Sequence, residues 1–350
     1  MNRFEGLAIA LILVLLYIVL IIAAPTVFTR PLIYMSFLET IPPTLIAALG
    51  LTLVITAGEI DLSFPAVVSL SGFALSWGWK SYGPVYGALL GIILALAAGA
   101  LVGVVNGIMV ARIRVPSIMA TLAANFFWYG ISILLAGGLQ VTLKDSRDSF
   151  FHEIFVGRLF GMVPIQAFWA LGLAIFLWFI LNRHKFGEGV MFIGDNANVA
   201  QVMGVNVEAT RIRLFALQGI ISAFAGIILT LDIGVFYPDQ GNFLLPAMAS
   251  VFIGGTSIAG GAGSIFGTLF GAFIIGSLAA GVVATTISGY WVQVVEGLVM
   301  GIVIVFNALM GTGNMRALST RFRHWGVPTQ VIPDGERLQS DNTAPDGLDH

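Results

Sequence analysis

Four carboxylates lie within or near long apolar runs of the sequence, namely Glu59, Asp61, Asp232 and Glu296. Burying a carboxylate in hydrocarbon is costly, so each one raises the hypothesis of a ligand or pathway group. Glu59 and Asp61 flank the end of one run, where an interfacial position or a cap on the next helix is the competing interpretation. Asp232 falls near the end of another run, where hydration would explain it. Glu296 lies deepest, one turn after Gln293, and either lines a pathway or makes a structural hydrogen bond.

Other kinds of chemistry find little support in the sequence. There is no cysteine, and the four histidines fall in predicted loops or in the C-terminal tail without a second ligand at metal-binding spacing. The glycine-rich stretches at 254–257 and 260–263 lack the lysine of a phosphate loop. No series of Asp, Glu and His follows the apolar runs as a proton relay would. We therefore expect no catalytic residue, metal or cofactor on this chain, and a source of energy outside it.

The composition identifies the elements that must position these groups. Apolar residues make up 58% of the chain and charged residues 10%, against about 25% charged in soluble domains. Nine of the 34 charged residues fall in 312–350. An ordinary soluble enzyme is excluded, and the net charge of −2 argues against a nucleic-acid partner. The sequence predicts an all-α, polytopic membrane domain over 1–311 and a cytoplasmic, disordered tail over 312–350.

Ten apolar segments predict about ten transmembrane helices, since long apolar runs in lipid must satisfy their backbone groups internally. The run at 245–257 is too short to cross alone and predicts a broken or re-entrant helix. Asn125, in the run at 116–137, joins Glu59, Asp61, Asp232, Gln293 and Glu296 as a pathway candidate. The predicted spans are 7–24, 41–57, 64–79, 83–110, 116–137, 164–182, 212–236, 245–257, 263–283 and 290–310.

Lys and Arg predict the orientation, because they are retained on the cytoplasmic side. With the N-terminus inside, eleven of these residues fall inside and five outside. Both termini are therefore predicted to be cytoplasmic, and so is the loop at 183–213. In this loop Asp195 is expected to cap a helix of about two turns that ends before Gly204. This segment is either a docking element or a solvated connector. It comprises Asp195, Asn196, Ala197, Asn198, Val199, Ala200, Gln201, Val202, Met203 and Gly204.

A weak internal repeat relates the segment at 62–69 to the segment at 244–250. Both contain Pro-Ala, two small or apolar residues and Ser, and a glycine-rich span follows each copy. The copies fall in the third and eighth spans and would cross in opposite directions, which predicts a five-plus-five inverted repeat. Glycines four residues apart, at 87 and 91, at 99, 103 and 107, at 267 and 271, and at 297 and 301, favour close helix packing.

Four ordered motifs resemble bacterial ABC importer permeases of the ribose, xylose, arabinose and galactose type. Residues 59–63 read Glu-Ile-Asp-Leu-Ser, residues 115–117 read Val-Pro-Ser with Thr-Leu at 121–122, and residues 193–207 are similar to the family's cytoplasmic loop. Residues 253–257 read Ile-Gly-Gly-Thr-Ser, which resembles a glycine-rich stretch of the same family. The match extends over roughly residues 40–310.

The resemblance implies a permease subunit of an importer in the bacterial inner membrane, paired as a homodimer or heterodimer. Its implied partners are cytoplasmic ATPase subunits, which hold ATP and Mg, and an extracytoplasmic solute-binding protein. It also implies that 195–204 carries the coupling helix, and that the solute is a sugar or a sugar-like molecule such as a polyol. The family commonly has Gly at the position of Glu59 and a Glu-Leu-Asp near 244–246, where this chain has Leu-Leu-Pro. The alternative is a self-sufficient secondary transporter or channel.

Overall fold

The computed structural model describes residues 5–238, 243–285 and 288–311, and its described part is a bundle of helices. Residues 1–307 form one compact unit, and 308–350 form a second, of which only the first four residues are described. The predicted tail at 312–350 lies outside the described residues. The helices are α1 Glu5–Ala23, α2 Pro25–Phe28, α3 Pro31–Thr40, α4 Pro42–Thr56, α5 Phe64–Tyr82, α6 Ala88–Ala111, α7 Ser117–Ala136, α8 Phe150–Val156, α9 Ile165–Arg183, α10 Lys185–Val202, α11 Val207–Ile233, α12 Leu244–Ile253, α13 Ile265–Ala284 and α14 Trp291–Gly311.

The described strands are two-residue pieces outside the long helices. β1 (Val141–Thr142) pairs antiparallel with β4 (Val235–Phe236), and β2 (Arg158–Leu159) pairs with β3 (Val163–Pro164). A π-helical turn, η1, covers Gly83–Gly87, and a 3-10 turn, η2, covers Ser146–Asp148. The prediction of an all-α fold is confirmed.

Among the described residues, six helices are long and apolar enough to cross a membrane, or seven when α3 and α4, which are bent by 50°, count as one span. One of the six, Phe64–Ala111, contains α5, η1 and α6. This segment folds back on itself, because Gly83 has φ +82° and Gly78 of α5 lies against Gly91 of α6. Each of the ten predicted spans therefore contains a helix. We did not predict α3, which precedes the bend at Pro42, a residue without an N–H group to continue the helical ladder.

The short span at 245–257 is confirmed as short. α12 has 10 residues, a length of about 15 Å, which is half the thickness of a hydrocarbon core. Pro65 and Pro246, the prolines of the predicted repeat, both lie in the first turn of a helix, where proline is tolerated. The inverted repeat itself stays a prediction.

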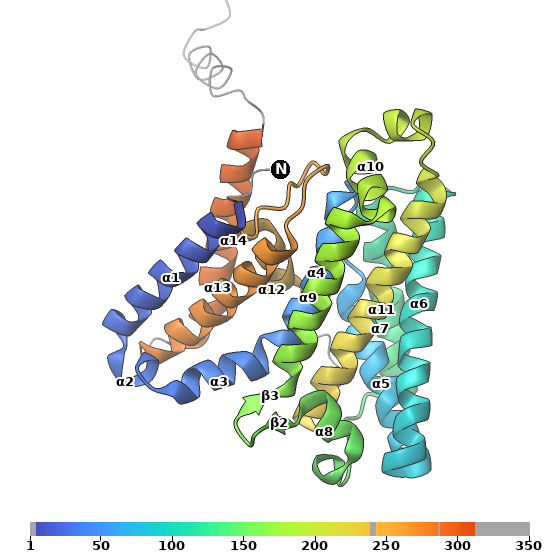
Figure 1. The fold of residues 1–350 in the computed structure, drawn as a ribbon. Helices are drawn as coiled ribbons and strands as arrows, with labels where there is room; N and C mark the ends of the chain where they lie inside the picture. The colour runs from blue at the N-terminus through green and yellow to red at the C-terminus, as the bar shows by residue number, and fades with distance from the viewer. Residues whose placement is uncertain (1–4, 239–242, 286–287, 312–350) are drawn as a thin grey trace, which may run out of the picture. The chain divides into compact units, whose positions relative to one another are not determined.

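The helix α4 is the most deeply buried part of the bundle, with nearly every residue from Pro42 to Thr56 buried. Figure 1 shows α4 and α9 between a group formed by α1, α12 and α13 and a group formed by α5, α6, α7 and α11. It also shows α10 at one end of the bundle and α8 with the β2–β3 hairpin at the opposite end. We call these the α10 end and the α8 end.

Glycines allow the closest helix contacts, as predicted, in three of the four spaced sets. A Cβ added at Gly99 would collide with Gly219 of α11, and one at Gly103 would lie 2.8 Å from the Cα of Ala216. For Gly297 and Gly301 no described atom lies within 4 Å of such a Cβ. Packing therefore explains the sets on α6 and α13, whereas the same spacing on α14 serves no contact within the described residues.

Candidate functional site

The 195–204 segment, predicted to be a capped helix, begins with a kink in α10. Asn196 has non-helical backbone angles, φ −158° and ψ 107°, and its Oδ1 accepts hydrogen bonds from the N–H groups of Asn198 and Val199 at 3.0 and 3.2 Å. Asn196 is therefore the cap, and the prediction that Asp195 has this role is wrong. Both residue types cap helices, and the site of the kink decides between them. Gly204 ends the segment with φ +88°, as predicted.

The 195–204 segment presents apolar side chains to the outside of the bundle. Val202 is 89% exposed, Met203 60% and Val199 53%, whereas Ala200 is fully buried. An exposed apolar patch that ends a kinked, capped helix has the form of a docking element.

The loop between α4 and α5 is held in place by side chains from two other helices, α6 and α7. Asn106 of α6 donates to the Ser63 hydroxyl at 2.7 Å, and Thr121 of α7 accepts from the N–H of Leu62 at 3.0 Å. Ser117 of α7 accepts from the N–H of Ile60 at 3.2 Å. The motifs at 59–63 and 115–122 are thus in direct contact and fix each other's geometry.

Asp61, a predicted pathway candidate, accepts two hydrogen bonds within this loop. Its Oδ1 accepts from the N–H of Ser63 at 2.7 Å and from the Ser63 hydroxyl at 2.6 Å, and its side chain is buried. Burial raises the pKa of the Asp61 carboxyl, and the hydrogen bonds from Ser63 act in the opposite direction. Asp61 therefore shapes the turn that precedes α5 and does not cap the helix, because the N-cap residue of α5 is Ser63 and no side chain makes a cap hydrogen bond there.

Glu59, another pathway candidate, forms an ion pair with Arg211 of α11. The Arg211 Nε lies 2.9 Å from the Glu59 Oε1, and the two side chains are only 24% and 10% exposed. A second pair, Arg112 with Glu208, has a similar distance of 3.0 Å but side chains that are 72% and 46% exposed. The sequence does not predict that Arg211 pairs with Glu59. Its one signal is that Arg211 is among the arginines near the ends of predicted spans.

The structure brings Glu59 and the 195–204 segment together at one cavity of about 770 Å³ at the α10 end. Its polar lining includes Glu59, Ser117, Asn198, Gln201 and Arg211. One cavity thus joins the α4–α5 loop, the start of α7 and the predicted coupling segment.

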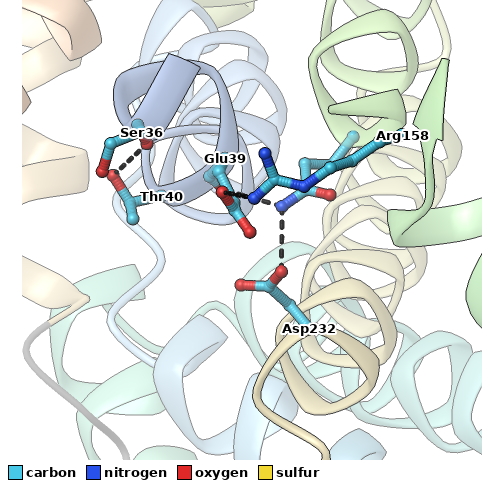
Figure 2. A network of polar contacts seen from close by, with 6 residues as sticks. Ser36, Glu39, Thr40, Arg158 and Asp232 are labelled. Atoms are coloured by element: carbon cyan, nitrogen blue, oxygen red, sulfur yellow. Dashed lines mark hydrogen bonds and ion pairs between the residues drawn. The ribbon is translucent and has the colours of Figure 1, made fainter. Parts of the chain in front are cut away.

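Asp232 belongs to a different network, at the α8 end, which is shown in Figure 2. Gln166 of α9 is fully buried and donates through Nε2 to the Asp232 carboxylate at 3.1 Å and to the Glu39 carbonyl at 2.8 Å. Arg158 of β2 donates to the Glu39 carboxylate at 2.7 Å. The network connects α3, β2, α9 and α11, so Asp232 is hydrogen-bonded rather than simply hydrated.

A cavity of about 530 Å³ at the α8 end contains Asp232, Glu39 and Arg158 in its lining, together with His152. Burial lowers the pKa of His152, the nearby charge of Arg147 acts in the same direction, and Asp148 opposes both. The folded protein therefore favours the neutral imidazole.

The three remaining pathway candidates line neither cavity. Glu296 on α14 is 6% exposed, and none of the described residues forms a hydrogen bond or an ion pair with it. Gln293 is exposed, and Asn125 is half-buried on α7. The described residues contain no group of three or more acidic or histidine side chains that could hold a metal ion.

Comparison with known proteins assigns the chain to a family. The sequence pattern of the family described as "Branched-chain amino acid transport system / permease component" matches residues 33–306. The chain belongs to this permease family. The permease is 34% identical to the ribose import permease protein of Escherichia coli strain K12 over 259 residues, which are 73% of this chain and 79% of the relative.

Another relative and a solved structure are also similar to this chain. The permease is 30% identical to the autoinducer 2 import system permease protein of Yersinia pseudotuberculosis over 305 residues, which are 85% of this chain and 84% of the relative. A solved structure titled PsaBC from Streptococcus pneumoniae in complex with Fab covers 80% of this chain and 91% of its own, with 16% identity and a TM-score of 0.42.

Proposed function

We propose that this permease is the membrane-spanning subunit of an ATP-driven importer of a sugar or sugar-like solute, polyols included, in the bacterial inner membrane. Its relatives are named as import permeases for ribose and for autoinducer 2, which supports a small polyhydroxylated solute. The permease transports and catalyses no reaction, and ATP is hydrolysed with Mg on a separate subunit.

The single observation that carries this proposal is the exposed apolar tip of the 195–204 segment. Val199, Val202 and Met203 offer apolar surface that the described part of the permease does not cover. The kink at Asn196 and the left-handed Gly204 fix the orientation of this tip. An ATPase subunit that buries the tip would couple ATP binding and hydrolysis to states of the bundle through differential contacts.

The excess of Lys and Arg on one side supports a cytoplasmic position for the α10 end and for both termini. The α8 end would then face a solute-binding protein outside the membrane. A second permease copy, identical or related, completes the transporter.

Substitution of Val202 tests the coupling assignment. Replacing Val202 with Asp places a charge in the proposed interface, and replacing it with Leu keeps the site apolar. Burying a valine contributes about 1.5–3 kcal/mol, so losing that contact lowers affinity at least roughly tenfold. We expect V202D to insert normally but to lose co-purification of the ATPase and uptake, and V202L to stay within about twofold of the wild type. Normal ATPase binding and uptake by V202D would refute the assignment.

A further inference from the structure

Three stretches of backbone meet without intervening side chains next to the 195–204 segment. They contain Gly58 at the end of α4, Gly194 in α10, and Gly260 in the glycine-rich loop between α12 and α13. A Cβ added at Gly260 would lie 2.8 Å from the carbonyl oxygen of Gly194 and 2.9 Å from the backbone N and Cα of Gly58. We call these three residues the glycine junction.

Backbone atoms also surround Gly194 on a second side. A Cβ at this position would overlap the carbonyl oxygen of Thr56 and the backbone nitrogen of Gly261. These two groups are hydrogen-bonded to each other, since the Gly261 N–H donates to the Thr56 carbonyl at 2.9 Å. The close approach therefore requires glycine at position 194. At positions 58 and 260 the backbone is left-handed, with φ values of +77° and +87°, and this conformation also favours glycine.

The junction lies beside the proposed docking helix and beside two loops that each lead into a helix. Gly194 is two residues before the kink at Asn196, which begins the proposed docking helix. Gly58 precedes Glu59 and the loop that starts α5, and Gly260 lies in the loop that starts α13. The junction thus connects the 195–204 segment with the loops that lead into both helices, one from each half of the bundle.

A contact made by backbone alone transmits displacement more directly than a contact between side chains. Side chains absorb small shifts by changing rotamers, but packed backbones have to move together or separate, because protein interiors are close-packed. The Glu59–Arg211 ion pair attaches the α4–α5 loop to α11 one residue after Gly58. A shift of the 195–204 segment therefore has a rigid route to α5 and to α13.

We propose that the glycine junction transmits movement of the 195–204 segment to the α4–α5 and α12–α13 loops during transport. Gly58, Gly194 and Gly260 are positioning residues that act through these loops. This inference rests on the proposed function, and it adds the route by which the ATPase acts on the bundle.

A neighbouring glycine provides a test with a built-in rescue. A Cβ at Gly263 would collide with the side-chain hydroxyl of Thr56, whereas a Cβ at Gly194 meets backbone that no substitution removes. If close spacing is what matters, Thr56→Ala should restore the Gly263→Ala variant but not the Gly194→Ala variant. Gly172 has no atom within 4 Å of an added Cβ, so Gly172→Ala is the matched control on α9.

The experiment compares G194A, G263A, G263A/T56A, T56A and G172A in proteoliposomes. Each variant is assembled with the ATPase and the solute-binding protein of its own importer, and radiolabelled D-ribose is the first solute probe, followed by D-xylose and ribitol. The readout is the amount of solute imported per ATP hydrolysed, and the amount of assembled complex is measured separately. A merely structural role would lower the amount of complex and leave this ratio unchanged.

We expect G194A and G263A to lower the ratio by about fivefold or more, the range of ordinary allosteric coupling, with ATP hydrolysis continuing. G263A/T56A should recover to within about twofold of T56A, and G172A should match the wild type. Ratios within twofold of the wild type in G194A and G263A would overturn the proposal. Failure of both variants to assemble would assign the junction to folding alone and would also overturn it. A wild type that imports none of the probes with ATP would instead count against the proposed function.

Discussion

The two Arg–Glu pairs at the α10 end predict very different effects of removing one partner. The Glu59–Arg211 pair is mostly buried, and the Arg112–Glu208 pair is mostly exposed, although their N–O distances are 2.9 and 3.0 Å. At an effective dielectric of about 20, the attraction within the buried pair is roughly 6 kcal/mol, and desolvation of both ions offsets much of it. Arg211→Ala leaves Glu59 buried and unpaired, so we expect a loss of about 3 kcal/mol in the free energy of unfolding. Arg112→Ala should cost no more than about 0.5 kcal/mol.

Double-mutant cycles on the two pairs measure this difference. Each cycle compares both single alanine variants and the double variant by tryptophan fluorescence during unfolding with SDS in mixed micelles. We expect a coupling energy of about 2 kcal/mol for Glu59–Arg211 and about 0.5 kcal/mol or less for Arg112–Glu208, because only the first pair is shielded from water. Equal coupling energies in the two cycles would refute our account of the α4–α5 loop as a segment fixed to α11.

Three further predictions concern the α8 end and helix packing. The pKa of His152 is lowered in the folded protein, so the unfolded chain binds a proton more readily and stability should fall as the pH drops through about 6.5. Thermal unfolding at pH 7.5 and pH 5.5 should show a smaller loss of stability for His152→Asn than for the wild type. Equal losses would contradict this prediction. Gln166→Ala removes the donor to Asp232 and should cost about 1–3 kcal/mol, measured by the same SDS titration; a cost below about 0.5 kcal/mol would refute the network in Figure 2. Gly103→Ala should lower the free energy of unfolding by about 1–3 kcal/mol, because the added Cβ would press against α11. Gly297→Ala, which has open space around its Cβ, should leave the free energy of unfolding unchanged or raise it. Equal effects would show that helix contact does not distinguish the two sites.

The helices could be predicted from the sequence because apolar runs in lipid have few alternatives. Each of the ten predicted spans contains a helix, and the run at 245–257 is short enough to be re-entrant. The helix at 31–40 was missed because the bend at Pro42 separates it from the longer apolar run. Glycine spacing predicted packing on α6 and α13 but not on α14, since spacing is local and contact depends on which helix lies opposite.

The candidate site depends on contacts between distant parts of the chain, and these have no local signal. The motif at 59–63 was visible, but not that Arg211 would pair with Glu59. The capping segment is also visible in the sequence, and the choice of Asn196 over Asp195 follows from the position of the kink in α10. The glycine junction joins three stretches that are far apart in sequence, so only the folded structure reveals it.

ATP-dependent uptake in proteoliposomes tests the central claim most directly. The permease is reconstituted alone or with the ATPase and solute-binding protein of its own importer. Accumulation of radiolabelled D-ribose, D-xylose and ribitol is followed with ATP, with a proton gradient or with a sodium gradient. We predict accumulation of one of these solutes only when ATP, the ATPase and the binding protein are all present. Accumulation by the permease alone, driven by either ion gradient, would contradict the account.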